Sequence, residues 1–301
     1  MLDGFAGPPP RRQPGSGRRA GARRRNRGAT DRGATDRGAT DRGATDRAVP
    51  PEAGGNGSGP ASPLSDDAAL NLLRQGSLEV LGRLIEASNE TWYCAIRAGG
   101  AEAACVYKPV AGERPLWDFP TGTLAGREVA AYAVSRAASW DVVPPTVMRD
   151  GPYGPGMCQL WIDVDPQVDL IELARRSDHT GLRDLAVFDA VVNNADRKIG
   201  HLLPMAGGHL LGCDHGVCFA EDYKLRTVLW QWRGKSLPGR AVEALHRLYA
   251  LLDAGELARE LSAWLSPGEQ AALSIRVAKL LKHRVHPYPP EDWPAVPWPP
   301  Y

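Results

Sequence analysis

Hydrophobic and polar positions divide the chain into a long polar segment and a region of regular apolar spacing. From residue 63 onward, short apolar runs bounded by turn residues predict strands at 78–85, 92–97, 103–107, 142–148 and 156–162. Apolar residues spaced at about 3.6 predict helices at 68–75, 124–138, 170–176, 182–193, 240–252, 254–264 and 267–283. The pattern therefore indicates an α+β fold, with a small antiparallel β-rich N-terminal lobe (63–163) and a mainly helical C-terminal lobe (164–285).

The two ends of the chain lack this periodicity. Residues 1–62 are rich in Gly, Pro and Arg, and the pentapeptide Gly-Ala-Thr-Asp-Arg repeats four times from Gly28 to Arg47. Such a segment cannot bury enough apolar area to fold, so we expect a disordered tail. Three interpretations remain open: a product of replication slippage, a mis-assigned start, or an Arg-rich arm that weakly contacts nucleic acid or other anions. Residues 286–301 are rich in Pro and Trp, and we expect them to dock on the domain or to bind a partner.

Composition narrows the class of protein. The 301 residues carry a net charge of +1 and are 43% hydrophobic, which is typical of a globular protein and argues against a dedicated nucleic-acid binder. The five cysteines are scattered and odd in number, which favours reduced thiols in the cytoplasm. Apolar runs of membrane-spanning length and an apolar secretory segment are both missing from the sequence.

Two acidic residues form the candidate site. Asp196 and Asp214 each follow an apolar segment, and they lie eighteen positions apart. Arg197, Lys198 and His201 follow the first acid closely. Paired carboxylates can hold a hard cation or orient a hydroxyl group, so this region is expected to carry the chemistry.

The segments around these acids, Asn194-Ala-Asp-Arg and Asp214-His-Gly, resemble the catalytic and metal-binding loops of the atypical protein-kinase-like fold. That fold includes the phosphatidylinositol 3-/4-kinases and the HipA-type kinases, and the strongest likeness is to an uncharacterised bacterial family labelled phosphatidylinositol 3-/4-kinase-like. Lys108-Pro followed by Gly112-Glu is also common in such sequences. The resemblance covers about residues 78–285. It implies a two-lobed kinase-like fold and an ATP-dependent phosphotransferase with Mg²⁺ or Mn²⁺, acting on an unknown hydroxyl-bearing protein, lipid or small molecule.

The resemblance also implies a role for individual residues. Asp196 would be the catalytic base, Asp214 the principal metal ligand, and Arg197 or Lys198 would neutralise developing charge. On the N-terminal side, Lys108 would hold the nucleotide phosphates and Glu128 would pair with it. The turn that contains Ser88, Asn89 and Thr91 would cover the phosphates, and backbone groups of Leu160, Trp161 and Ile162 would contact adenine, although the Trp161 ring is expected to belong to the core.

His201 departs from the pattern. The relatives usually place an Asn there as second metal ligand, and imidazole is a poorer ligand for Mg²⁺ than an oxygen. The site would then use one metal, prefer Mn²⁺, or belong to a non-catalytic ATP-binding pseudokinase or scaffold. A zinc-binding or metal-hydrolase protein is a further alternative, because six candidate ligands are close in sequence: His201, His209, Cys213, Asp214, His215 and Cys218.

Overall fold

The computed structural model describes residues 64–85 and 87–301, which all belong to one compact unit of the chain, residues 46–301. The expectations for residues 1–62, including the repeats and the Arg-rich arm, lie outside the described residues.

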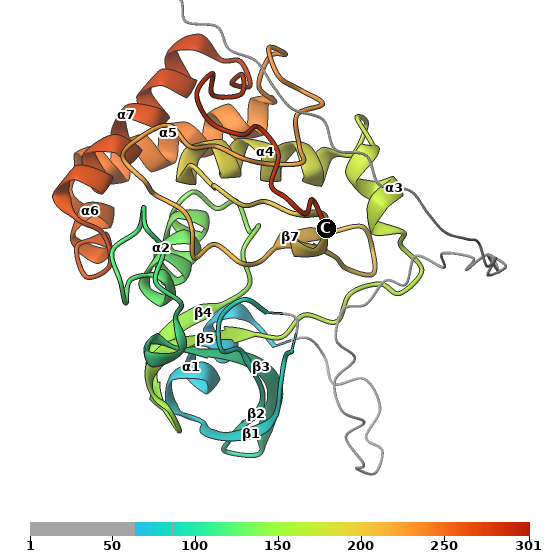
Figure 1. Ribbon diagram of the computed structural model, residues 1–301, viewed down its shortest axis with the longest axis vertical. Coiled ribbons are helices and arrows are strands. Elements are labelled where there is room, and N and C mark those ends of the chain that lie inside the picture. Colours follow the sequence, from blue (N-terminus) through green and yellow to red (C-terminus); the bar gives the residue numbers. More distant parts are fainter. Residues whose placement is uncertain (1–63, 86) are drawn as a thin grey trace, which may run out of the picture. The chain divides into compact units, whose positions relative to one another are not determined.

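The N-terminal lobe contains one five-stranded antiparallel sheet with the strand order β1-β2-β3-β5-β4 (Figure 1). The strands are β1 (Ser77–Arg83), β2 (Trp92–Ala98), β3 (Ala101–Pro109), β4 (Thr146–Gly151) and β5 (Gly154–Leu160), and two helices pack against them, α1 (Asp66–Gln75) and α2 (Leu124–Ala137). The strand predicted at 142–148 begins later, at Thr146, because Pro144 and Pro145 have no amide hydrogen to donate to a sheet.

Helix α2 connects the sheet to the C-terminal lobe and is buried on almost every side. It packs against β4 and β5 on one side and against helices of the C-terminal lobe on the other. At Gly126 a side chain would meet the Trp264 ring at 3.2 Å, so glycine permits the close approach. Its buried Arg127 forms an ion pair with Glu269 of the C-terminal lobe. Any group carried by α2 is thereby fixed relative to both lobes.

The C-terminal lobe is mainly helical. It contains α3 (Leu170–Arg175), α4 (Thr180–Val192), the 3₁₀ helix η2 (Ile199–His201), the hairpin β6 (Leu202–Pro204) and β7 (Leu210–Gly212), and α5 (Gly239–Asp253), α6 (Glu256–Leu261) and α7 (Pro267–His283). The helix expected at 254–264 is shorter than predicted, because Gly255 has a φ of +76° and separates α6 from α5. The two-lobed α+β architecture predicted from the sequence is confirmed.

The segment after α7 returns across the C-terminal lobe, and Figure 1 marks its end beside the β6–β7 hairpin. The Gly234 amide donates to the His286 carbonyl at 2.9 Å, and the Thr227 amide donates to the Ala295 carbonyl at 3.0 Å. Close to the end, the Ile199 amide donates to the Pro300 carbonyl at 2.9 Å. We call residues 286–301 the C-terminal segment; it docks on the domain through its own backbone.

The five cysteines, all within the described residues, form no disulfide, and four of them are buried. Among the described residues, every helix is too short or too polar to cross a lipid bilayer.

The buried ion pair between Arg127 and Glu269 makes α2 a test of inter-lobe stability. Replacing Arg127 with Met should lower the free energy of unfolding by about 3–5 kcal/mol, because the Glu269 carboxylate is left buried without its partner. Urea denaturation measures the change. The matched control is Arg97→Met, which breaks exposed ion pairs with Glu79 and Glu102 and should change stability much less. Equal effects would contradict this account of α2.

His286 makes stability depend on pH. Burial, with help from the nearby charges of Arg183 and Lys235, lowers its pKa to about 4. Below the ordinary His pKa of about 6.5 the unfolded chain binds a proton that the folded chain excludes, so stability should fall as the pH drops from about 6.5 to about 4. In urea denaturation across this range, His286→Phe should show a shallower fall than the wild type. The matched control for replacing an imidazole by a phenyl ring is His246→Phe, at an exposed position.

Candidate functional site

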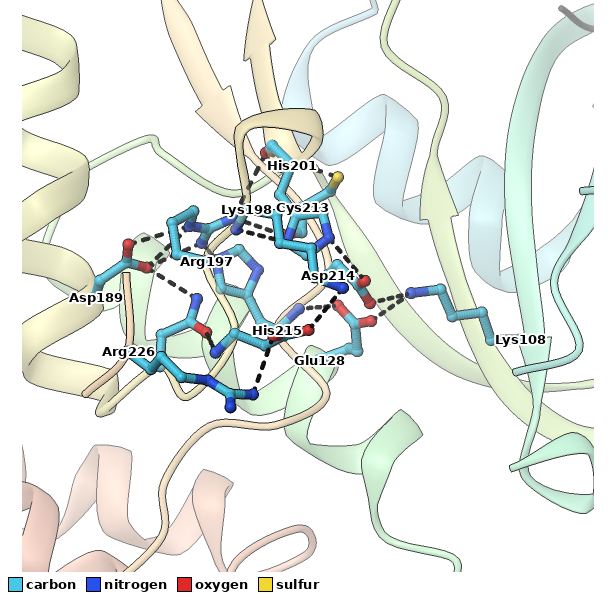
Figure 2. Close-up of polar contacts among 12 residues, drawn as sticks. Lys108, Glu128, Asp189, Arg197, Lys198, His201, Cys213, Asp214, His215 and Arg226 are labelled. Atoms are coloured by element: carbon cyan, nitrogen blue, oxygen red, sulfur yellow. Dashed lines mark hydrogen bonds and ion pairs between the residues drawn. The ribbon is translucent and has the colours of Figure 1, made fainter. Parts of the chain in front are cut away.

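The site is centred on one lysine that contacts two carboxylates (Figure 2). Lys108 Nζ donates to Glu128 Oε1 at 2.7 Å and to Asp214 Oδ1 at 2.9 Å. Lys108 and Glu128 belong to the N-terminal lobe, whereas Asp214 follows β7 in the C-terminal lobe. The ion pair expected between Lys108 and Glu128 is present, and the same ammonium also joins the two lobes.

The charges of this group support one another. Burial alone would disfavour the Lys108 ammonium, but the carboxylates of Asp214 and Glu128 outweigh burial and raise the pKa of Lys108 above its ordinary value. The nearby Lys108 charge is the main reason that the pKa of Asp214 lies below its ordinary value. Both groups are therefore ionised at neutral pH. The Asp214 side chain nevertheless remains 49% exposed, so part of its carboxylate faces open space.

Local structure explains why Lys108 and Glu128 meet. Side chains alternate along a strand, so Tyr107 points into the core and Lys108 points to the opposite face, into the cleft. The Glu113 carboxylate accepts hydrogen bonds from the Leu124 and Ala125 amides at 3.1 and 2.7 Å, and thus caps the first turn of α2. Its neighbour Gly112 allows close contact with Glu90, where any added side chain would clash. The Gly-Glu pair thus fixes the start of the helix that carries Glu128.

The backbone around Asp214 has a special conformation. Asp214 has a φ of +62°, a left-handed conformation that is uncommon outside glycine. The next residue, His215, donates its amide to Glu128 Oε2 at 2.9 Å. Glu128 therefore holds the Lys108 ammonium with one oxygen and the turn after Asp214 with the other. This arrangement sets the distance between the α2 carboxylate and the Asp214 side chain.

A buried polar network supports the loop after α4. Asp189 accepts from Arg197 Nη2 at 2.9 Å and from Asn194 Nδ2 at 3.0 Å, and all three side chains are fully buried. Arg197 also donates to the Cys213 carbonyl at 2.7 Å, and so ties the loop to the Asp214 strand. The prediction that Arg197 neutralises charge on a substrate is therefore wrong, because its guanidinium is enclosed and committed to protein partners. It positions the loop instead.

Asp196 points toward the cleft between two cations. Lys198 Nζ lies 3.2 Å from Asp196 Oδ2, and Arg226 Nη2 lies 3.1 Å from Oδ1. Burial raises the pKa of Asp196 above its ordinary value, and the two cations oppose that effect. Arg226 also donates from Nε to the Ala195 carbonyl at 2.6 Å. Asp196 is thus held in a fixed orientation.

The His201 ring lies beside the Asp214 carboxylate. Its Nδ1 accepts from the Lys198 amide at 3.4 Å, which leaves the proton on Nε2, and Nε2 lies 3.3 Å from Asp214 Oδ2. Burial lowers the pKa of His201 to about 4, so the ring is neutral at neutral pH. In this tautomer Nε2 has no lone pair for a metal. The role of His201 as a metal ligand stays a prediction, and the structure places its ring to orient Asp214.

Two cavities meet at Lys108 and Asp214. One, of about 180 Å³, is bounded by apolar side chains of both lobes and by the residues predicted to contact a nucleotide. Its lining includes Ser88, Asn89, Thr91, Leu160, Trp161, Ile162, His201 and Leu203. The other, of about 360 Å³, contains Asp196, Arg226 and the ring of Trp293. Lys108 and Asp214 therefore stand at the junction of a mainly apolar cavity and a cavity that holds the candidate base.

The connection between the lobes corrects part of the predicted adenine contact. The Leu160 amide donates to the Pro145 carbonyl at 2.9 Å and the Trp161 amide to the Ala104 carbonyl at 3.0 Å, so neither can donate to a base. The Trp161 ring is half-buried and makes an edge contact with Tyr93 at 5.0 Å. Among the hydrogen bonds of the described residues, the Ile162 amide donates to no protein group. Ile162 is thus the residue of this predicted set with an available donor.

The turn between β1 and β2 is fixed mainly by its own polar groups. The Thr91 hydroxyl donates to the Asn89 carbonyl at 3.3 Å, and the Asn89 side-chain oxygen accepts from the Arg114 amide at 2.9 Å. Thr91 is only 3% exposed, so its hydroxyl shapes the turn, contrary to the prediction that it contacts phosphate. Ser88 is exposed beside the cavity and keeps its predicted position.

The six candidate zinc ligands do not converge. In the described part of the chain, His, Cys, Asp and Glu side chains form no group of three that could hold a metal ion. His215 is buried and its Nε2 lies 2.6 Å from Arg197 Nη2, while Cys218 is buried in the core. The spacing of these residues in the sequence therefore does not produce a zinc site among the described residues.

Two residues of the site, Lys224 and Arg226, were missed by sequence reasoning, and Glu113 was noted only as part of the Gly-Glu pair, without its role. Glu113 caps a helix that begins eleven residues later, so no local capping pattern reveals it. Lys224 and Arg226 lie in a segment without periodicity, and their contacts depend on the return of the chain after Asp214. In such a segment the sequence does not indicate which partner a charged residue will contact.

The role assigned to Arg197 can be tested through its partner. Asp189→Asn removes the carboxylate that, among the described residues, pairs with the buried Arg197 guanidinium, so the free energy of unfolding should fall by about 3–5 kcal/mol in urea denaturation. Asp178→Asn, an exposed carboxylate paired with Arg176, is the control and should stay near the wild type. If Asp189→Asn left stability unchanged, Arg197 would not be a structural residue.

Comparison with known proteins adds the following. No family model matches the chain. Among solved structures the chain is similar to the Helicobacter pylori proinflammatory kinase CtkA, with a TM-score of 0.41 and 13% identity over 71% of this chain and 94% of that chain. Protein Rv2133c of Mycobacterium tuberculosis is 43% identical over 276 residues, which cover 80% of this chain and 98% of that protein. At this identity and coverage, the chain belongs to the same family as Rv2133c.

Proposed function

We propose that this protein binds ATP between its lobes and transfers the terminal phosphate to a hydroxyl group. The observation that carries the proposal is the Lys108 ammonium, held between Glu128 and Asp214 at the junction of two cavities. A cation fixed by a helix carboxylate, next to an exposed carboxylate of the other lobe, is what a phosphate-holding site of the kinase type requires. The phosphatidylinositol 3-/4-kinase-like resemblance supports the reaction class and leaves the acceptor open.

The smaller cavity has the character expected for a nucleobase. Ile162, Leu203 and Leu211 form an apolar cluster, and Leu160 and Cys213 pack against it. The Ile162 amide supplies a donor at the connection between the lobes. A flat base would bury apolar area there, while its phosphates would extend toward Lys108 and Ser88. This orientation leaves the larger cavity for the acceptor.

The residues present fit a magnesium ion. Mg²⁺ in such sites usually has one or two carboxylate ligands and takes its other oxygens from phosphate and water, so a group of three protein ligands is not required. Asp214 supplies an ionised and partly exposed carboxylate, with Asp196 facing the same cavity. When bound, the ion would neutralise phosphate charge. Mn²⁺ would suit the same donors.

Asp196 and Lys198 would act at the acceptor. The Asp196 carboxylate, fixed by Arg226 and Lys198, would orient the acceptor hydroxyl and take its proton. The Lys198 ammonium lies beside it and would balance charge on the transferred phosphoryl group. We place this activity in the cytoplasm, because the five cysteines form no disulfide.

A non-catalytic ATP-binding protein is the second candidate. The observation that favours it is His201, whose Nε2 lies 3.3 Å from Asp214 Oδ2 at the position where kinases of the resembled type have a metal-binding amide oxygen. Such a protein would bind the nucleotide through Lys108 and Ile162 and would not turn it over. Binding and transfer must therefore be measured separately.

We expect the wild type to bind ATP with Mg²⁺ or Mn²⁺, as measured by calorimetric titration. Lys108→Met should weaken binding at least about tenfold, because it removes a charge-assisted contact to phosphate. Asp214→Asn should abolish the dependence of affinity on the metal. Lys282→Met, which changes an exposed lysine of α7, is the control for loss of a positive charge.

The catalytic assignment is tested by Asp196→Asn. This variant should keep the ATP affinity of the wild type and lose about 10²–10⁴-fold in phosphate release or transfer, the usual contribution of a general base. Wild-type binding without turnover would select the non-catalytic candidate. Failure of the wild type to bind any nucleotide would refute both.

A further inference from the structure

Lys224 stands in a cage of aromatic rings at the edge of the larger cavity. Its Nζ lies 5.1 Å from the centre of the Trp117 ring, 5.8 Å from that of Phe119 and 5.0 Å from that of Trp293. The Asp118 carboxylate completes the cage at 3.0 Å. The Lys224 and Asp118 side chains are each only 11% exposed. An ammonium among three aromatic rings and a carboxylate combines cation–π attraction with an ion pair.

The cage joins three segments that are far apart in the sequence. Trp117, Asp118 and Phe119 belong to the N-terminal lobe, between β3 and α2. Lys224 lies after the Asp214 turn, and its amide donates to the Asn193 side chain at 3.0 Å, at the end of α4. Trp293 belongs to the C-terminal segment, and its ring centre lies 6.2 Å from that of Trp117. The Lys224 cage therefore closes one side of the cavity that holds Asp196.

The C-terminal segment is anchored at the same place. The Ala295 carbonyl accepts from the Thr227 amide at 3.0 Å and from Trp230 Nε1 at 2.8 Å. The Pro300 carbonyl accepts from the Ile199 amide at 2.9 Å, between Lys198 and His201. The segment thus rests on the chain that carries Arg226 and on the loop that carries Asp196.

An extended polypeptide acceptor that binds by strand addition would need free backbone near Asp196 to pair with. The chain that follows Asp214 does not offer it. The Val217 carbonyl accepts from Ala195, the Arg226 amide donates to the Asn194 carbonyl, and the Thr227 amide is taken by the C-terminal segment. Three hydrogen-bonding groups between Val217 and Thr227 are thus already used within the protein. The Lys224 cage lies in the same stretch of the chain.

We propose that the Lys224 cage limits the acceptor to a small soluble molecule with a hydroxyl group, and that it excludes polypeptides and headgroups embedded in a membrane. This inference rests on the proposed phosphate transfer. The cavity of about 360 Å³ is in the size range of small-molecule sites, and it joins aromatic walls at Trp117 and Trp293 to the polar floor at Asp196. The cage determines specificity, and the ATP side of the cleft contains none of its residues.

Amide hydrogen exchange tests whether the Lys224 cage holds the C-terminal segment in place, and this measurement does not depend on activity. Lys224→Met keeps the length of the side chain and removes the charge, so exchange at the Thr227 and Ile199 amides should rise roughly fivefold or more. Trp293→Ala should have the same effect without altering the body of the domain. Lys282→Met should match the wild type. Unchanged exchange in both cage variants would overturn the proposal.

The acceptor class is tested with ATP that carries a radiolabelled terminal phosphate. A bacterial extract is split by ultrafiltration into metabolites and macromolecules, and phosphatidylinositol vesicles form a third arm. With the wild type, label should appear in metabolites other than ATP and free phosphate, separated by chromatography, and should stay out of the proteins and the vesicles. Lys224→Met should bind ATP as the wild type does and should gain label in the protein fraction.

Each outcome separates this inference from the proposed function. Label that the wild type places mainly on proteins or vesicles would overturn the small-acceptor inference and keep phosphate transfer. ATP binding without label in any arm would overturn both the inference and the transfer. Loss of ATP binding in Lys224→Met would show that the cage serves the nucleotide, which would also contradict the proposal.

Discussion

The double contact of Lys108 is the constraint on which the rest of the site depends. An ammonium that is largely removed from water is stable only with opposite charge beside it, and here the charge comes from both lobes. Glu128 can serve because α2 is buried between the sheet and the C-terminal helices and is capped by Glu113. Asp214 can serve because the turn that follows it is bonded to the other Glu128 oxygen. The relative position of the lobes and the charge of the site are therefore set by the same few atoms.

The polar residues of the last turn of α4 and of the loop that follows it fall into two groups with different roles. Asp189, Asn194 and Arg197 are fully buried and satisfy one another, which is how such groups avoid the large cost of burial without partners. Asp196 and His201 line the cavities of the cleft, and Lys198 lies beside Asp196. A buried network of this kind specifies one loop conformation. The buried network therefore fixes the positions of Asp196, Lys198 and His201.

The sequence was sufficient for the parts of the fold that follow from local pattern. Strand alternation and helical spacing placed most elements, and the order of Lys108, Glu128, Asp196 and Asp214 anticipated which side chains gather at the cleft. The sequence could not show that Arg197 is structural whereas Asp196 faces the cleft, because the burial of adjacent polar residues cannot be read from their sequence. It also failed where a partner lies far along the chain: Arg226 and Lys224 meet their partners through a return of the chain that has no periodic signal. The amides of Leu160 and Trp161 were misjudged because tertiary hydrogen bonds had already used them.

The bond from Ile199 to the Pro300 carbonyl has a consequence for how the protein is made. The two residues are about a hundred positions apart, and chains emerge from the ribosome with the N-terminal part first. The loop that carries Asp196 therefore leaves the ribosome long before its last hydrogen-bond partner exists. Until residues 295–300 have been synthesised, the amides of Ile199 and Thr227 lack the acceptors they have in the finished protein. The site is completed only after residues 295–300 have been synthesised, so a shorter chain would contain every acidic residue of the site without the two hydrogen bonds from Ile199 and Thr227 to the C-terminal segment.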